Sequence, residues 1–334
     1  MIATIAPAGV RGPEVPRRHR VYVRSAHDLR QAMQHARNSA LPLDASGLDR
    51  ILHLDVARQL LEVQAAALWS SLVDYLAASA PELSALAADP GLPASVEQSV
   101  SANAAGPDGR PICAHVEALT LVTADGELRR ASRDSNRELF ALALGGQGVI
   151  GIPYSVTLRL ESLRKSCSAP RSDLRVAGCT PLLRSESDLT LLLPPERLDA
   201  LFDRLRDKAA EWRVPIVGTA VRRTQVEEET MLRWARREYA EVRLSLAPPS
   251  VLGARVRAAQ ARRELIDTAV ARGGAFAPAN IFDASPAQAE ACYPQLKMFL
   301  AEKRRLDPAE RLYNPWYRHA RALLSRDPVT VRWG

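Results

Sequence analysis

The chain has 334 residues, which accommodates two domains of roughly 100–200 residues each, and 47% of its residues are hydrophobic, enough for a buried core. Its net charge of +7 does not point to a nucleic-acid partner, because the arginines are scattered along predicted helices among Asp and Glu. No run approaches the roughly 18 apolar residues of a membrane span, and the four cysteines form no Cys-x-x-Cys pair. These features argue against a disulfide scaffold and a zinc site and favour a cytoplasmic protein without a nucleic-acid or membrane partner.

The first half of the chain predicts a mixed layer of strands and helices. Residues 1–19 are expected to be a flexible leader, 21–24 a short strand, and Ser25 the N-cap of a helix over 28–38. Residues 50–55 and 60–65 predict two strands that pair around 56–59. An amphipathic helix is expected over 68–78, and a further strand over 116–123.

The second half predicts alternating strands and helices. The strands are expected at 189–193, 214–221 and 241–246, and the helices at 195–212, 227–237, 254–272 and 286–306. A Ser- and Arg-rich stretch at 162–170 predicts a domain boundary. We therefore expect an α+β fold with a first domain at 20–163, a smaller α/β domain at 164–300, and a segment at 301–322 that returns to the first domain. A cleft between the domains is the natural place for a small molecule.

The most informative segment is 125–160. Asp125-Gly126 predicts a hairpin turn, 136–140 a short helix, 145–151 a glycine-rich bend and 154–160 a returning strand. Because glycine has no Cβ, bare backbone in such a unit can approach a flat cofactor.

In this segment and several others the chain resembles the FAD-linked oxidases of the vanillyl-alcohol-oxidase type, in the branch near the aldonolactone oxidases. The resemblance runs in the same linear order from about Arg24 to Tyr317. It rests on residues 47–51, 64–67, 99–106 and 125–160 in the first half, and on 264–267, 272–274, 293–294, 303–308 and 313–316 in the last third.

The resemblance implies a PCMH-type FAD-binding domain followed by an α/β substrate or cap domain. It also implies a non-covalent FAD and a small alcohol, lactone or biosynthetic intermediate as substrate. The candidate residues that it implies are Ser101, Asn103 and Gly106 at a flavin edge, Gly148, Gly151 and Ile152 on the adenine side, and Lys303, Arg304 and Asn314 beside the ring as catalytic candidates.

The chain departs from this family where the flavin diphosphate is held. That group needs several backbone N–H donors at a bend, which the family supplies as a glycine-rich loop after the first strand, helix and strand. Here residues 41–48 contain only Gly47, and much of the loop is missing. Glu97 stands where the family tends to place glycine, and a carboxylate there repels a diphosphate. His53 does not match the histidine that links the flavin covalently in relatives.

Two functions therefore stay open. The first is an FAD-linked oxidoreductase with a degenerate flavin site, which the retained 101–106 and 145–152 segments favour. The second is a flavin-free homologue that catalyses a non-redox cyclisation or isomerisation in a biosynthetic pathway, which the missing loop and Glu97 favour.

Several candidates also have a purely structural interpretation. Ser101 and Asn103 can satisfy buried turn backbone, and Lys303 and Arg304 lie near a helix C-terminus, where cations are favoured. His115 is expected to be a hydrogen-bonded structural histidine rather than a base. The aromatic residues Trp234 and Tyr239 are expected on the apolar stripe of a helix.

Overall fold

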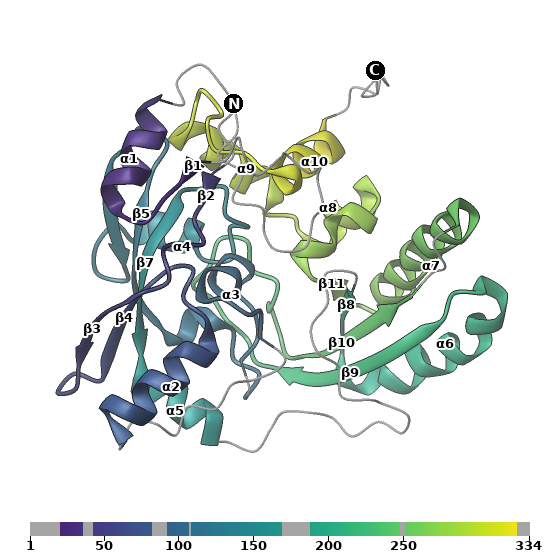
Figure 1. Ribbon diagram of the computed structural model, residues 1–334. Coiled ribbons are helices and arrows are strands. Elements are labelled where there is room, and N and C mark those ends of the chain that lie inside the picture. The colour runs from purple at the N-terminus through teal and green to yellow at the C-terminus, as the bar shows by residue number, and fades with distance from the viewer. Residues whose placement is uncertain are drawn as a thin grey trace.

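The computed structural model describes residues 21–35, 43–81, 92–106, 108–168, 188–247 and 251–325. Helices and antiparallel sheets form two units, one around a five-stranded sheet and one around a four-stranded sheet (Figure 1). The predicted two-domain α+β fold is therefore confirmed. The exact domain boundaries stay a prediction.

The five-stranded sheet of the first domain is antiparallel and has the order β3-β4-β7-β5-β6. Both predicted hairpins are present, and Gly126 at the β5–β6 turn has a φ of 86°, which side-chain-bearing residues rarely adopt. The strands are β3 (Ile51–Asp55), β4 (Leu60–Gln64), β5 (Val116–Val122), β6 (Leu128–Ser132) and β7 (Ile152–Arg159).

Short helices surround this sheet. Ser25 caps α1 as predicted, since its Oγ accepts from the Asp28 N–H at 3.1 Å. On α2, Trp69, Leu72 and Leu76 are buried as predicted, and the Trp69 indole N–H donates to Ser99 Oγ at 2.9 Å. The elements are α1 (Ala26–His35), the parallel pair β1 (Val21–Tyr22) and β2 (Leu43–Asp44), α2 (Trp69–Ser79), α3 (Val96–Ala102), η3 (Ile112–His115), α4 (Arg137–Ala143) and α5 (Leu160–Ser168).

The second domain has a four-stranded antiparallel sheet of order β11-β8-β10-β9. Two long helices, α6 (Leu198–Trp212) and α7 (Leu252–Ala271), lie along one side of it (Figure 1). The strands are β8 (Asp188–Leu193), β9 (Ile216–Thr224), β10 (Tyr239–Leu246) and β11 (Ala275–Phe276), and the short turns η4 (Pro195–Arg197) and η5 (Pro278–Asp283) complete the domain. Every residue of β10 is buried, so both faces of the sheet are covered.

The predicted helix over 227–237 is wrong, because the segment between β9 and β10 contains no helix. The Glu227 carboxylate accepts from the backbone N–H groups of Glu229 at 2.9 Å and Thr230 at 3.0 Å, and this local turn competes with helical hydrogen bonding. Trp234 and Tyr239 therefore do not lie on a helical stripe. Trp234 belongs to the connecting segment, and Tyr239 begins β10.

The single helix predicted over 286–306 is two helices, α8 (Pro286–Cys292) and α9 (Leu296–Leu306). The break follows from Pro294, which has no N–H to donate and disfavours a helical conformation in the residue before it. Tyr293 accordingly has φ −130° and ψ 67°, and its hydroxyl donates to the Phe276 carbonyl. A further helix, α10 (Pro315–Leu324), begins at the N-cap Asn314.

The C-terminal segment lies beside the first elements of the chain (Figure 1). The Arg311 guanidinium donates to the carbonyl oxygens of Met33 at the end of α1 and Ala124 after β5. The turn before Arg311 is held by Asp307, whose carboxylate accepts from the N–H groups of Arg311 and Leu312 and pairs with Lys303.

The two domains meet closely at Gly109, which has a φ of 82° and whose carbonyl accepts from the Gln225 N–H at 2.8 Å. A Cβ at this position would collide with the backbone carbonyl of Arg223 on β9. Only glycine therefore meets both the conformational and the spatial demands of this contact.

We predict that Gly109→Ala lowers the free energy of unfolding by about 1–3 kcal/mol, because it combines a positive φ with a steric clash at the domain contact. Gly253→Ala on α7 is the matched control. It meets only the flexible Arg257 side chain and is expected to be neutral or stabilising. Urea unfolding of the two variants measures the difference, and equal stabilities would contradict the close contact.

Candidate functional site

Asn103 ends α3 and joins the two domains. It adopts the left-handed conformation, with φ 47° and ψ 48°, and is 1% exposed. Its carbonyl accepts from the Trp234 indole N–H at 3.0 Å, its Oδ1 from the Cys113 N–H at 3.0 Å, and its Nδ2 donates to Glu227 Oε1 at 3.4 Å. Asparagine tolerates this conformation better than most residues, so the αL end of α3 fits the residue found there.

Near Asn103, the second domain also forms hydrogen bonds with the loop that follows α3. One Nη of Arg222 on β9 donates to the carbonyls of Ala105 at 2.7 Å and Gly106 at 3.0 Å. The Gly106 N–H donates to the Arg110 carbonyl within its own loop. Gly106 thus serves a contact between the domains in this structure.

The backbone N–H groups in the first turn of α3 are hydrogen-bonded within the protein. The N–H groups of Val96 and Glu97 donate to the carbonyls of Ala67 at 3.0 Å and Ala65 at 2.8 Å, while those of Gln98 and Ser99 donate to Ser95. Ser95 and Gln98 form a reciprocal capping box. Because all four N–H groups have protein acceptors, this helix start has none left for an anion.

The side chains of α3 add a carboxylate at this point. Ser101 Oγ donates to Glu97 Oε1 at 2.7 Å. Burial raises the pKa of the Glu97 carboxyl above its ordinary value, and the hydrogen bond from Ser101 opposes that shift. Ser101, expected at a flavin edge, is in this structure paired with an acid.

The segment where relatives carry the diphosphate loop is a tight turn after β2. The Ser46 N–H donates to Asp44 Oδ1 at 3.1 Å, and the Leu48 N–H donates to the Ala45 carbonyl at 2.9 Å. A Cβ on Gly47 would lie 2.9 Å from Cγ of Arg24, so this glycine is explained by packing against the chain after β1. Within residues 43–48, two backbone donors of the turn, those of Ser46 and Leu48, are therefore bonded inside the turn itself.

The glycine-rich bend packs against α3. The N–H groups of Gly145 and Gln147 donate to the carbonyls of Val100 and Ser101, each at 2.9 Å. Gly148 has a φ of 70°, and a Cβ on it would face Ser101 and Glu97. A Cβ on Gly151 would collide with Leu121, and Ile152 begins β7 as a buried core residue.

Of the three catalytic candidates, two are buried and connected. Asn314 caps α10 by accepting from the Tyr317 N–H at 2.9 Å, and it donates to the Gln147 carbonyl in the glycine-rich bend at 2.8 Å. Lys303 is fully buried, pairs with Asp307 and lies 5.2 Å from the centre of the Tyr317 ring. Burial lowers the pKa of Lys303, and Asp307 opposes that effect. Arg304 is exposed, and its charge acts on the nearby Tyr317. Catalytic roles for the three stay a prediction.

Two small cavities lie next to the candidate cofactor residues. One of about 10 Å³ is enclosed by residues that include Ser101, Gly148 and Gly151. The second, of about 20 Å³, is the interdomain pocket. Either has room for about one water molecule. The interdomain pocket is lined by Ala102, Ala104, Ala105, Thr190, Leu192, Trp234, Glu241, Ala277, Pro278 and Ala279.

A polar sheet face borders the interdomain pocket. Glu241 is 7% exposed and Arg243 is 4% exposed, and they lie two residues apart on β10, so they share a face of the sheet. Glu241 Oε2 and the Nε and Nη1 of Arg243 have no hydrogen-bond partner in the part of the chain that the structure describes. Burying an unpaired guanidinium is strongly unfavourable, so this pair marks a place where a ligand group is expected.

The sequence analysis missed Glu241 and Arg243, although β10 itself was predicted. The signal was the alternation along 239–246, where Ala240, Val242 and Leu244 are apolar and the residues between them are polar. Two charges inside a strand with both faces covered are unusual, and they indicate a buried polar site.

The contacts of His115 are those of a buried structural residue. It is fully buried, and its Nδ1 lies 2.8 Å from Ser162 Oγ. Burial, together with the positive charge of Arg110 and Arg159, lowers the pKa of His115 to about 4, so the ring is neutral at physiological pH. Cys113 and Cys292 are buried free thiols whose pKa values are raised by burial.

Comparison with known families gives a match in the first domain. Residues 17–132 match the family model of an FAD binding domain. The matched stretch includes β1 to β6, α2 and α3, and it supports the expectation of an FAD-linked oxidoreductase type of protein for this part of the chain. The branch near the aldonolactone oxidases stays a prediction. No curated protein gives a significant match to the chain.

The FAD that the matched family model implies does not fit two described segments, the 43–48 turn and the start of α3. A diphosphate requires free backbone donors, and the donors of these segments named above are bonded to the protein. Glu97 and Asp44 place carboxyl groups beside them. The described helices include none that is long and apolar enough to cross a membrane. The same residues contain no group of His, Cys, Asp and Glu suited to a metal ion.

We predict a pH-dependent difference between the wild type and Glu97→Gln. Because the folded chain raises the pKa of Glu97, its stabilising contribution is present below about pH 4.5, the ordinary value, and is lost as the pH rises through the folded pKa. Glutamine stays neutral and still accepts from Ser101. The variant should therefore gain stability relative to wild type as the pH rises, by at most about 1.4 kcal/mol per pH unit.

Urea unfolding from pH 4 to 8 measures this difference, with the exposed Glu228→Gln as the matched control. A gap between Glu97→Gln and wild type that stays constant over this range would show that the carboxylate is not held in a buried environment.

Proposed function

We propose that this protein is a flavin-independent small-molecule enzyme built on the scaffold of the FAD-linked oxidoreductases. It would catalyse a non-redox isomerisation or cyclisation of a small biosynthetic intermediate at the interdomain pocket. The observation that carries the proposal is the buried pair Glu241 and Arg243 on the sheet face that borders this pocket. Glu241 Oε2 and the Nε and Nη1 of Arg243 have no hydrogen-bond partner among the residues that the structure describes.

The two side chains have complementary roles in proton transfer. Glu241 is a carboxylate with one oxygen free to take a proton from a substrate C–H or O–H group. Arg243 has N–H donors for the oxygen on which negative charge develops. The same carboxyl then returns the proton to another atom of the substrate, so atoms are conserved and no electron acceptor is needed.

The surroundings favour a small, partly apolar substrate. Five alanines and Trp234 line the pocket, and Thr190 adds a hydroxyl beside Arg243 in the register of β8 and β10. The present volume of about 20 Å³ is too small for a metabolite. Substrate entry therefore requires the pocket to widen, and the boundary between the domains is where such movement is expected.

The absence of flavin chemistry is tested by the colour of the protein. Purified full-length chain, scanned in the visible range before and after incubation with FAD, is expected to show no flavin absorbance. A flavin spectrum that survives gel filtration would contradict the proposal.

Glu241 is tested by proton exchange. Small lactones and keto or hydroxy acids are incubated with the protein in D2O, and deuterium incorporation is followed by NMR. For a substrate that exchanges, Glu241→Gln should reduce the rate by about 10²–10⁴-fold, the usual contribution of a general base. An unchanged rate would remove Glu241 from the mechanism.

The second candidate function is an FAD-linked oxidoreductase acting on a small alcohol or lactone with non-covalent flavin. The match of residues 17–132 to an FAD binding domain favours it. In that case bound flavin would be released by denaturation, since His53 is exposed on β3 and no covalent attachment is expected.

Arg243 is expected to lower the free energy of unfolding of the ligand-free protein, because its guanidinium is available for a ligand. Replacing it by methionine removes a buried unpaired charge at similar length, so Arg243→Met should raise the free energy of unfolding without ligand by about 1–3 kcal/mol. The exposed Arg206→Met is the control and should change little. Thermal and urea unfolding measure both. Destabilisation by Arg243→Met would mean that the guanidinium already has a partner.

A further inference from the structure

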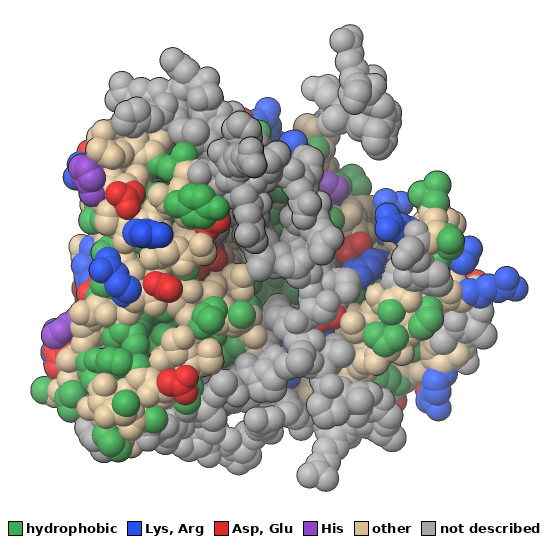
Figure 2. Space-filling view, in the orientation of Figure 1, with side chains coloured by type: hydrophobic (Ala, Val, Ile, Leu, Met, Phe, Trp, Pro, Cys, Tyr) green, Lys and Arg blue, Asp and Glu red, His purple; other side chains and the backbone are tan. Residues whose placement is uncertain are grey.

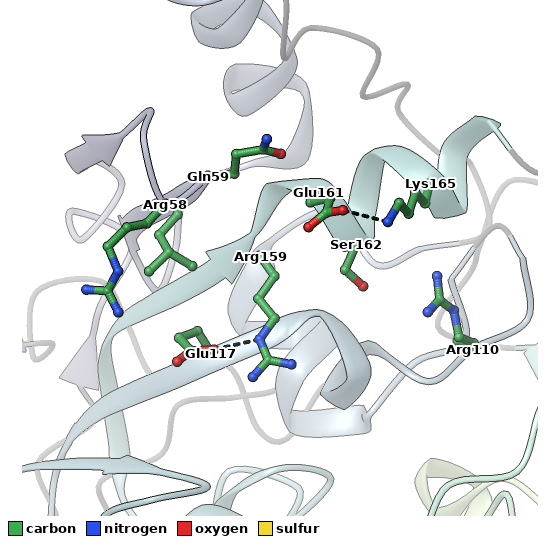
Figure 3. Close-up of a pocket in the computed structure, with 9 residues that line it drawn as sticks. Arg58, Gln59, Arg110, Glu117, Arg159, Glu161, Ser162 and Lys165 are labelled. Atoms are coloured by element: carbon green, nitrogen blue, oxygen red, sulfur yellow. Dashed lines mark hydrogen bonds and ion pairs between the residues drawn. The ribbon is translucent and has the colours of Figure 1, made fainter.

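A surface groove of about 430 Å³ lies on the first domain, apart from the interdomain pocket. It lies where β7 runs into α5, and the β3–β4 turn and the start of β5 complete it. Figure 3 shows Arg110, Arg159 and Ser162 around a common space. We call it the α5 groove.

Four cations from separate parts of the chain line the α5 groove: Arg58, Arg110, Arg159 and Lys165. Three carboxylates oppose them. Glu117 pairs with Arg159 at 2.6 Å, Glu161 with Lys165 at 2.5 Å, and Asp108 with Arg110 at 2.6 Å. The groove therefore keeps a net positive charge.

Both central arginines have donors to spare. Glu117 and Asp108 each engage the Nε of their arginine, and the described residues provide no acceptor for the Nη groups of Arg110 or Arg159. Their side chains are 33% and 37% exposed, so these groups face the groove and remain accessible. A guanidinium with its Nη edge free is suited to bind a carboxylate or phosphate.

The floor of the groove supports the same interpretation. Ser162 lines it, and its hydroxyl is held at 2.8 Å from Nδ1 of the fully buried His115. The Nε2 of His115 has no partner in the described part of the chain. Burial and the positive charge of Arg110 and Arg159 lower the pKa of this ring, and Asp108 opposes that effect.

We propose that the α5 groove binds the oxyanion group, phosphate or carboxylate, of a small molecule. The Nη groups of Arg110 and Arg159 bind the oxygens from two sides. Ser162 contributes its hydroxyl, and Arg58 and Lys165 add long-range attraction. This proposal does not depend on the function proposed for the interdomain pocket, because the α5 groove and that pocket share no lining residue.

The test is isothermal titration of the full chain with inorganic phosphate, and separately with citrate, in buffers of matched ionic strength. Saturable binding of only one probe shows whether the groove prefers a phosphate or a carboxylate. Saturable binding of both shows that it accepts oxyanions of either class. No binding of either probe overturns the proposal.

Variants locate the site. The double variant Arg110→Gln with Arg159→Gln should weaken binding at least about tenfold, whereas Arg206→Gln on α6, whose ion pair with Asp203 is exposed, should leave it unchanged. Glu161→Gln removes a competing carboxylate and should tighten binding by about threefold or more. Equal affinities for wild type, the double variant and Glu161→Gln would overturn the proposal. Glu161→Gln keeps the test decisive even if the double variant fails to fold.

Discussion

The arrangement of the two domains depends on the left-handed residue at the end of α3. Asn103 directs its carbonyl to Trp234, its amide nitrogen to Glu227 and its side-chain oxygen to Cys113, so one buried residue fixes three segments of the chain. Burial raises the pKa of Glu227, and its hydrogen bonds from Thr230 and Glu229 oppose the shift. Because each of these groups is buried, losing one partner leaves another without a hydrogen bond. The position of the polar face of β10 follows from this contact.

In the stretch that matches an FAD binding domain, the backbone donors at the start of α3 form hydrogen bonds within the chain. Donors that would point toward a diphosphate instead hold α3, the 64–67 run and the glycine-rich bend together. A fold of this kind retains its shape because its backbone groups find partners within the chain. The glycines that survive are needed for packing against Leu121 and for positive φ values, and their presence does not require a cofactor.

Much of the fold could be predicted from the sequence, because period-2 alternation and turn residues act locally. The β3–β4 and β5–β6 hairpins and helix α7 are of this kind. The structure of residues 227–237 could not be predicted in this way. There the Glu227 carboxylate accepts hydrogen bonds from nearby N–H groups while it is buried against Asn103, a contact between distant parts of the sequence. The break between α8 and α9 follows from a local signal, because Pro294 cannot continue a helix. Cofactor candidates such as Gly148 and Asn314 do lie near one another, but the unpaired state of Arg243 depends on burial, which only the three-dimensional structure reveals.

The bonds from Arg311 to the carbonyls of Met33 and Ala124 connect segments that are 278 and 187 residues apart in the sequence. During synthesis the ribosome releases residue 33 long before residue 311, so these two acceptors receive their bonds from Arg311 only after the later segment has been made. The contacts of α1 and of the segment after β5 with Arg311 are consequently among the last to form. In nascent chains that stall before residue 311, these hydrogen bonds are absent.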